Sequence, residues 1–323
     1  MERSAFIKTL AGASIFMAMD GFSSLVNAIA AQGVGKADSP EFARFGAIHL
    51  NNTSLDRATE FWTNVAGLHL RRSGSQVAEF GTESQTLVVV HATAQKSFQE
   101  GYSGLYHFAI HAPDKHAFAA MVHRLIAHNY PFSPIDHTMT QSVYLTDPDG
   151  ITVEFALETP ERFKRVLTQG GLRMEGSDGI VRAASAPLDV DAVLKDRLTP
   201  GLNAPVAEGA RIGHIHLYAQ DVPQSDAFYK KMGFKEFNYL PQYLYADVGA
   251  GGVYQHRVAM NSWHGINRPL APQEHAGMRH FQIIIDSPEA LTQALAHVPQ
   301  HETRDGGHWM HDPTGNLLYV TQG

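Results

Sequence analysis

Two histidines and one glutamate in this chain could together hold a metal ion. His49, His107 and Glu154 stand in segments whose apolar residues alternate as in β-strands. Two imidazoles and one carboxylate leave three coordination positions open on Fe(II) and similar divalent metals. A catechol could occupy two open positions through its oxygens and O2 the third, so that both reactants meet on one ion. These three residues are therefore the predicted metal ligands.

The composition limits the alternatives. The 323 residues include no cysteine, which excludes disulfides, Fe–S clusters, zinc–thiolate sites and thiol nucleophiles. Any metal must be held by imidazole, carboxylate, phenolate or water. The formal net charge is −7 and no long basic run occurs, so a nucleic-acid partner is not expected.

Three short phrases occur twice along the chain in the same order. Residues 45–50 resemble 212–217, residues 104–110 resemble 277–283, and residues 144–150 resemble 309–315. This repeat predicts two homologous domains, at 44–160 and 211–321. The stretch 161–210 carries Gly170-Gly171 and many polar residues, and we expect a linker there with one short helix at Leu188–Leu198.

Each predicted domain contains the order β-α-β-β-β twice. In the first unit a helix follows the N-cap candidate Ser54 and stops at Gly67, and the second unit begins at Tyr106. This order resembles the vicinal oxygen chelate superfamily over residues 44–321. The resemblance implies an α+β fold of tandem domains, each with paired units that form an open, barrel-like sheet. The three predicted ligands would converge in the cavity of the first domain.

The segment before Glu154 has a more specific pattern. His137, Tyr144, the turn at 147–150 and Glu154 follow one another at the spacing of a signature that resembles extradiol ring-cleavage dioxygenases, in the two-domain bacterial catechol-2,3-dioxygenase branch. The resemblance implies that Glu154 is a ligand, that His137 forms hydrogen bonds on the O2 or substrate side, and that Tyr144 donates to a substrate oxygen. It also implies that His91, at the end of the fourth strand, is the acid–base residue.

The predicted function is extradiol (meta) cleavage of catechol or a substituted catechol with O2 at a mononuclear Fe(II) centre, although Mn(II) would fit the same ligands. A glyoxalase-like isomerase or thiol transferase would use the same fold without redox chemistry. A binding protein of the bleomycin-sequestering type would need no metal. Glyoxalase-type enzymes have a glutamate ligand where this chain has His91, which argues against glyoxalase I.

The second predicted domain keeps only part of this constellation. His216 matches His49, His280 matches His107, and His256 approximates His91. Tyr319 stands where Glu154 would be expected, so a facial triad is not completed there. We expect this domain to pack against the first and to shape the mouth of the substrate cavity. The sequence leaves open whether it binds a second metal.

The first 32 residues differ from the rest. Arg3 and Lys8 precede apolar stretches, and residues 28–31 resemble a cleavage site for an export signal. The segment resembles a twin-arginine signal in which Ser4 replaces the second arginine, which predicts a periplasmic protein. The alternative is a disordered segment or an amphipathic helix at the N-terminus of a cytoplasmic protein. No stretch reaches the ~18 uninterrupted apolar residues that a membrane span needs. A homo-oligomer remains open.

Overall fold

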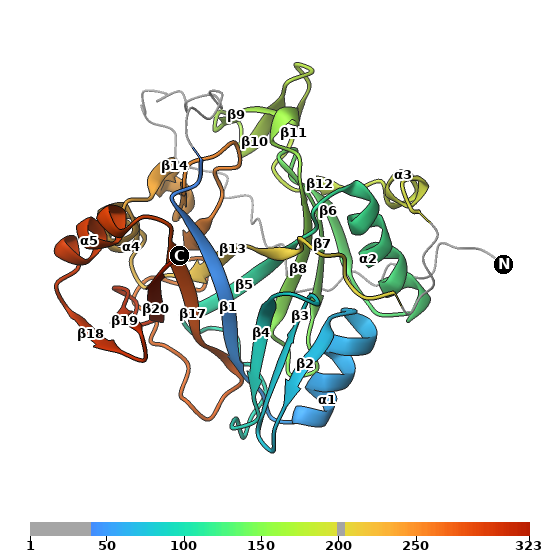
Figure 1. Ribbon diagram of the computed structural model, residues 1–323. Helices are drawn as coiled ribbons and strands as arrows, with labels where there is room; N and C mark the ends of the chain where they lie inside the picture. The colour runs from blue at the N-terminus through green and yellow to red at the C-terminus, as the bar shows by residue number, and fades with distance from the viewer. Residues whose placement is uncertain (1–39, 199–203) are drawn as a thin grey trace.

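The computed structural model describes residues 40–198 and 204–323, and these contain the four predicted β-α-β-β-β units (Figure 1). The first unit consists of β1 (Ala43–Asn51), α1 (Leu55–Glu60) with a π-helical continuation (Phe61–Val65), β2 (His69–Ser73), β3 (Val77–Gly81) and β4 (Thr86–His91). The second consists of β5 (Gly104–His111), α2 (Lys115–Ala127), β6 (Ser133–Asp136), β7 (Thr140–Thr146) and β8 (Thr152–Glu158). The predicted export signal at 1–32 lies outside the described residues.

The other two units follow a connecting segment. The third consists of β13 (Arg211–Tyr218), α4 (Val222–Lys231), β14 (Lys235–Leu240), β15 (Tyr245–Gly249) and β16 (Val258–Asn261). The fourth consists of β17 (Gly277–Ile285), α5 (Pro288–His297), β18 (His301–Arg304), β19 (Gly307–His311) and β20 (Leu317–Gln322). Within the two described ranges, no helix is long and apolar enough to cross a membrane.

Each unit starts its helix in the same way. A Ser or Asp side chain at the N-cap accepts the backbone N–H three residues later, which satisfies one of the free donors at the helix start. The four capping residues are Ser54, Asp114, Asp221 and Ser287. The repeated phrases of the sequence therefore correspond to repeated local structure.

The units pair across the two repeats. β1 lies antiparallel to β17 in an eight-stranded sheet, so the first unit is joined to the fourth. β5 lies antiparallel to β13 in a nine-stranded sheet, so the second unit is joined to the third (Figure 1). The sheets therefore differ from the predicted domains 44–160 and 211–321, neither of which completes a sheet by itself. All four units begin with a similar strand, so the sequence of a unit does not determine its partner.

The connection between the repeats contains more structure than the predicted linker. β9 (Phe163–Leu167), β10 (Arg173–Gly176) and β11 (Val181–Ala183) form a separate three-stranded sheet. Next, β12 (Ala186–Pro187) extends the nine-stranded sheet beside β6. The expected short helix is present as α3 (Val190–Lys195), packed near α2 (Figure 1).

One continuous hydrophobic core joins the units. The Trp62 ring is fully buried, and its centroid lies 6.4 Å from that of Phe80 in the same unit and 6.1 Å from that of Phe108 on β5. Because successive side chains of a strand point to opposite faces, the burial of Phe108 in this core turns His107 to the other face of its sheet.

A cut between residues 198 and 204 tests this pairing of units. Pieces 40–198 and 204–323 each contain half of both sheets, so alone each would expose the unpaired edges of two first strands. We expect each piece to aggregate when it is expressed alone and the two to copurify as one compact species when co-expressed, as measured by size-exclusion chromatography. A soluble monomer of residues 40–198 alone would contradict the topology.

Candidate metal centre

Three buried donor atoms converge on the inner face of the nine-stranded sheet. They are Nε2 of His107 on β5, Nε2 of His214 on β13 and Oε2 of Glu154 on β8. The two nitrogens are 3.2 Å apart, and the carboxylate oxygen lies 3.1 Å from His107 and 3.0 Å from His214. All three residues are at most 3% exposed. The antiparallel pairing of β5 with β13 brings together the two histidines, which are 107 positions apart.

The separations of the donors fit one metal ion. Donors at right angles and about 2.1 Å from an ion lie about 3.0 Å apart, whereas tetrahedral donors at the same bond length lie about 3.4 Å apart. The two separations from Oε2, 3.0 and 3.1 Å, are nearer the right-angled value, and the 3.2 Å between the two nitrogens lies midway. Although both imidazoles are close to it, the buried Oε2 of Glu154 receives no well-aligned hydrogen bond. The donors therefore point to a shared position, and this set suits Fe, Mn or Zn in the divalent state.

Two of the donors, His214 and Glu154, are held in the protonation states that a metal needs. Burial lowers the pKa of His214 well below its usual value, so the ring is neutral. Burial alone would raise the pKa of Glu154, but the adjacent imidazoles of His214 and His107 outweigh it and hold this pKa well below its usual range. Ser142 donates to the other oxygen, Oε1, at 2.5 Å and so orients the carboxylate.

One side of the centre carries no donor. β5 and β13 are related by an approximate two-fold axis at the pair Phe108–Ile215. Glu154 on β8 pairs with Ala109 of β5. The two-fold axis relates Ala109 to His216 of β13, and the residue that pairs with His216 is Ala259. A methyl group thus stands where a second carboxylate could have completed the coordination. The candidate centre therefore has three convergent protein donors.

His137 and Tyr144, the two residues that the signature singled out, lie on one side of the candidate centre. Tyr144 follows Ser142 on β7, and its ring lies 5.3 Å from that of His107. The Nδ1 atom of His137 donates to the Ala184 carbonyl oxygen at 2.7 Å, so its Nε2 accepts from the Tyr144 hydroxyl at 2.9 Å. Burial raises the pKa of Tyr144 well above 10 and lowers that of His137, so both groups are neutral.

On the other side of the centre, His256 faces the ligands. Its ring lies 4.7 Å from the ring of His214 and 6.0 Å from that of His216. The Nδ1 atom of His256 is 2.6 Å from Oδ2 of Asp247, which also accepts from the Tyr245 hydroxyl at 2.9 Å. The carboxylate fixes the orientation of the ring through Nδ1.

Comparison with known proteins identifies the family. The family model of the Glyoxalase/Bleomycin resistance protein/Dioxygenase superfamily matches residues 44–155. These residues belong to that superfamily. The chain is also 27% identical over 259 residues to a protein named catechol-2,3-dioxygenase from Bacillus subtilis, covering 78% of this chain and 86% of the relative.

Solved structures extend the likeness to most of the chain. A Bacillus subtilis protein solved under a provisional description as a dioxygenase aligns with a TM-score of 0.53 at 13% identity, covering 86% of this chain and 85% of the other. A variant of glyoxalase I from Zea mays aligns with a TM-score of 0.50 at 16% identity, covering 87% and 94%. At such identities these matches show a shared fold over most of the chain.

The structure corrects the predicted grouping of ligands. It brings His107 and Glu154 together, but His49 lies on β1 in the eight-stranded sheet. There its Nδ1 atom is 3.1 Å from Nε2 of His91, and its ring stacks on that of His280 at 3.9 Å. His91, the predicted acid–base residue, therefore also lies away from the centre. The cause is the pairing of units across the repeats, which places β1 and β4 in the other sheet.

His214 completes the donor set and was not among the predicted ligands. The sequence repeat aligns His216 with His49. The strand registers support this alignment, because His216 pairs with His107 in one sheet and His49 pairs with His280 in the other. His214 stands two residues earlier, where the first repeat has Ala47. β13 carries two histidines on one face, and only His216 has a matching histidine in the first repeat. The unmatched His214 was the signal that could have identified this donor.

The eight-stranded sheet lacks most of the donors. Its strand registers place His280, Ala47 and Tyr319 at the positions of His107, His214 and Glu154. Only one of the three donors is kept, and the Tyr319 hydroxyl donates to the Asp305 carbonyl oxygen instead. In the described residues, only the nine-stranded sheet has a convergent group of three such side chains.

Replacement of single histidines distinguishes the two groupings. His214→Ala removes a ligand, so we expect a loss of metal affinity greater than the roughly 10–100-fold that loss of an outer hydrogen-bonding partner costs. The matched variant His49→Ala should keep full metal content because its ring lies in the other sheet. Metal analysis of the purified proteins after reconstitution measures both. Metal lost from His49→Ala but kept by His214→Ala would restore the grouping predicted from the sequence.

Proposed function

We propose that this protein is an extradiol ring-cleaving dioxygenase that opens catechol or a substituted catechol with O2 at a mononuclear Fe(II) centre. The observation that carries the proposal is the three-ligand face of His107, His214 and Glu154, with Ala259 where a fourth ligand could stand. A diol needs two coordination positions and O2 a third, and this donor set leaves that number open. The relative named catechol-2,3-dioxygenase supports the same class of reaction.

The reaction is balanced without another reductant. Catechol and O2 combine into a hydroxymuconic semialdehyde, one ring C–C bond breaks, and both oxygen atoms remain in the product. Fe(II) would hold both reactants side by side and carry electron density from the ring to O2. His107 and His214 would supply neutral lone pairs and Glu154 one negative charge, and Mn(II) could use the same ligands.

We assign the proton transfer from the substrate to one histidine, His256. His256 replaces the predicted His91: its Nδ1 is held by Asp247, so its Nε2 can take a proton from a catechol hydroxyl. On the opposite side, His137 and Tyr144 form a neutral pair. The phenol of Tyr144 keeps its proton because burial raises its pKa. To donate to a substrate oxygen it would turn its single O–H away from Nε2 of His137.

The aromatic surroundings fit a planar substrate. The ring of Tyr106 lies 4.8 Å from that of His107 and 4.8 Å from that of His216, and 5.8 Å from that of Trp263. His216 is itself oriented by Asn261, whose Nδ2 donates to its Nε2 at 2.9 Å. Flat aromatic and imidazole rings favour binding of an aromatic ring over a flexible chain.

An aerobic assay tests the proposal. Protein reconstituted with Fe(II) without air and then given catechol and O2 should form a yellow ring-opened product and consume one O2 per catechol. His256→Ala should lower kcat by about 10²–10⁴-fold, the usual contribution of a general acid–base residue, while the iron stays bound.

The matched control is His91→Ala, which changes a histidine of the other sheet and should leave kcat unchanged. An iron-loaded wild-type protein that turns over no catechol would refute the proposal. If the same protein isomerised a glutathione hemithioacetal, a glyoxalase-type reaction would replace it.

A further inference from the structure

A second imidazole lies directly behind the ligand His214. Nε2 of His111 is 2.9 Å from Nδ1 of His214, on the side of the ring away from the converging donors. On its own far side, Nδ1 of His111 is 2.8 Å from Oε1 of Glu158. His111 is 2% exposed, so neither nitrogen can rely on bulk water. His214, His111 and Glu158 thus form one line of hydrogen-bonded side chains that starts at the proposed metal position.

The hydrogens of this line follow from the ligand. Nε2 of His214 must carry a lone pair toward a metal, so its proton is on Nδ1 and is donated to Nε2 of His111. The proton of His111 is then on Nδ1 and is donated to Glu158. Each ring nitrogen has one role, and only this pair of tautomers satisfies all of them.

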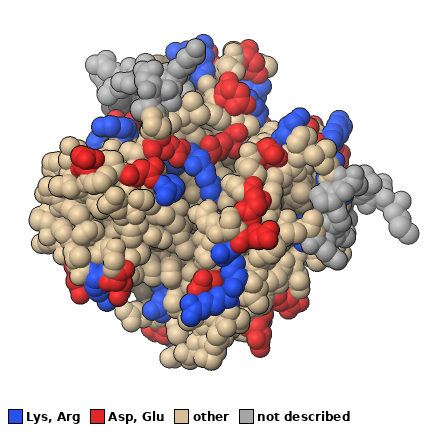
Figure 2. Space-filling view, in the orientation of Figure 1, with Lys and Arg blue, Asp and Glu red and all other residues tan. Residues whose placement is uncertain are grey.

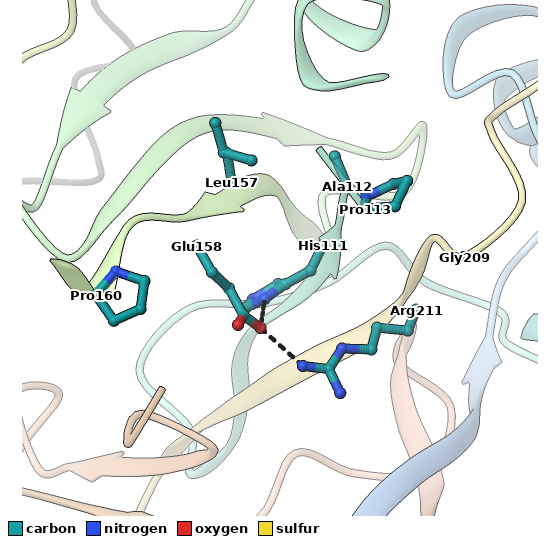
Figure 3. A pocket seen from close by; sticks show the side chains of 8 residues that line it. All are labelled: His111, Ala112, Pro113, Leu157, Glu158, Pro160, Gly209 and Arg211. Atoms are coloured by element: carbon teal, nitrogen blue, oxygen red, sulfur yellow. Dashed lines mark hydrogen bonds and ion pairs between the residues drawn. The ribbon is translucent and has the colours of Figure 1, made fainter. Parts of the chain in front are cut away.

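Two arginines hold the outer end of the line. Oε1 of Glu158 accepts from Arg257 Nη1 at 2.7 Å and from Arg211 Nη2 at 3.0 Å. Both arginines also contact Glu41, just before β1. Figure 3 shows His111, Glu158 and Arg211 pointing toward one another at the wall of a cavity of about 270 Å³. The carboxylate is therefore fixed at a charged junction beside the eight-stranded sheet.

The backbone leaves room for the His111 ring. A Cβ at Gly213 would lie 2.0–2.2 Å from three atoms of this ring. Gly213 stands directly before the ligand His214, at an irregularity in the pairing of β13 with β5. Any side chain at position 213 would thus drive His111 out of its place behind the ligand.

The eight-stranded sheet provides an internal comparison. In the nine-stranded sheet Arg211 pairs with His111, and in the eight-stranded sheet the matching Arg44 pairs with Ile284. Ile284 therefore occupies the position of His111. Four residues after Tyr319, at the position of Glu158, the chain has Gly323. Where Ala47 replaces the ligand His214, both members of the support are therefore absent too.

We propose that His111 and Glu158 are positioning residues that hold His214 in the tautomer and orientation needed to bind the metal. The inference rests on the proposed metal centre. Without the line, the buried Nδ1–H of His214 would have no acceptor and the ring could turn its proton toward the metal position. The role concerns the affinity of the protein for the ion, which can be measured apart from ring cleavage.

The test uses the full chain without air, with Co(II) alone as the probe and a chromophoric chelator as competitor at fixed pH. Loss of such a partner usually costs about 10–100-fold in metal affinity. We expect His111→Leu to raise the Kd for Co(II) by that factor. Gln can accept and donate as the imidazole does, so His111→Gln should recover most of the affinity. Gly213→Ala, which displaces the ring without removing a polar group, should weaken binding in the same direction.

Urea unfolding of each apo-protein separates binding from folding. The control His49→Leu, in the other sheet, should bind Co(II) as the wild type does. If either His111→Leu or Gly213→Ala folds and keeps the wild-type Kd, the inference is overturned while the metal centre stands. An equal loss in His111→Gln and His111→Leu would also overturn it. If the wild-type protein binds no Co(II), the proposed centre itself fails, and the inference fails with it.

Discussion

The centre depends on one antiparallel strand pair, β5 with β13. Phe108 of β5 pairs with Ile215 of β13, and both side chains enter the shared core. Their burial turns the neighbouring His107 and His214 to the opposite face of the sheet. A shift of the register by one residue would move both imidazoles into the core. Burial of apolar side chains thus fixes the positions of the polar ones, and the carboxylate on β8 is added by parallel pairing with β5.

The two sheets show what the chemistry requires beyond the fold. Both have the same approximate two-fold arrangement of first strands, and both keep a histidine pair across it, His107 with His216 and His49 with His280. Only the nine-stranded sheet adds a carboxylate and a second convergent imidazole, backed by His111 and Glu158. The fold alone therefore does not make a metal site, and one sheet can keep its architecture after losing the donors.

Local structure was predictable from the sequence, whereas the pairing of units was not. Caps, alternating strands and the turn at 147–150 are encoded within a few residues, so the sequence predicted the four units and placed His107 and Glu154 among the candidate ligands. Which first strand pairs with β5 depends on contacts between distant segments, and the four first strands are too alike to distinguish. The errors at His49 and His91 follow from that one choice, since their counterparts in the nine-stranded sheet, His216 and the segment holding His256, lie at the centre.

The central claim is that one metal ion is bound by residues from both repeats. Anomalous X-ray scattering at the iron edge from crystals loaded with Fe(II) without O2 tests it most directly. The account predicts one strong peak between Nε2 of His107, Nε2 of His214 and Oε2 of Glu154, with a bond of about 2.1 Å to each. A peak bound by His49 and His91 in the eight-stranded sheet, with none at Glu154, would contradict it.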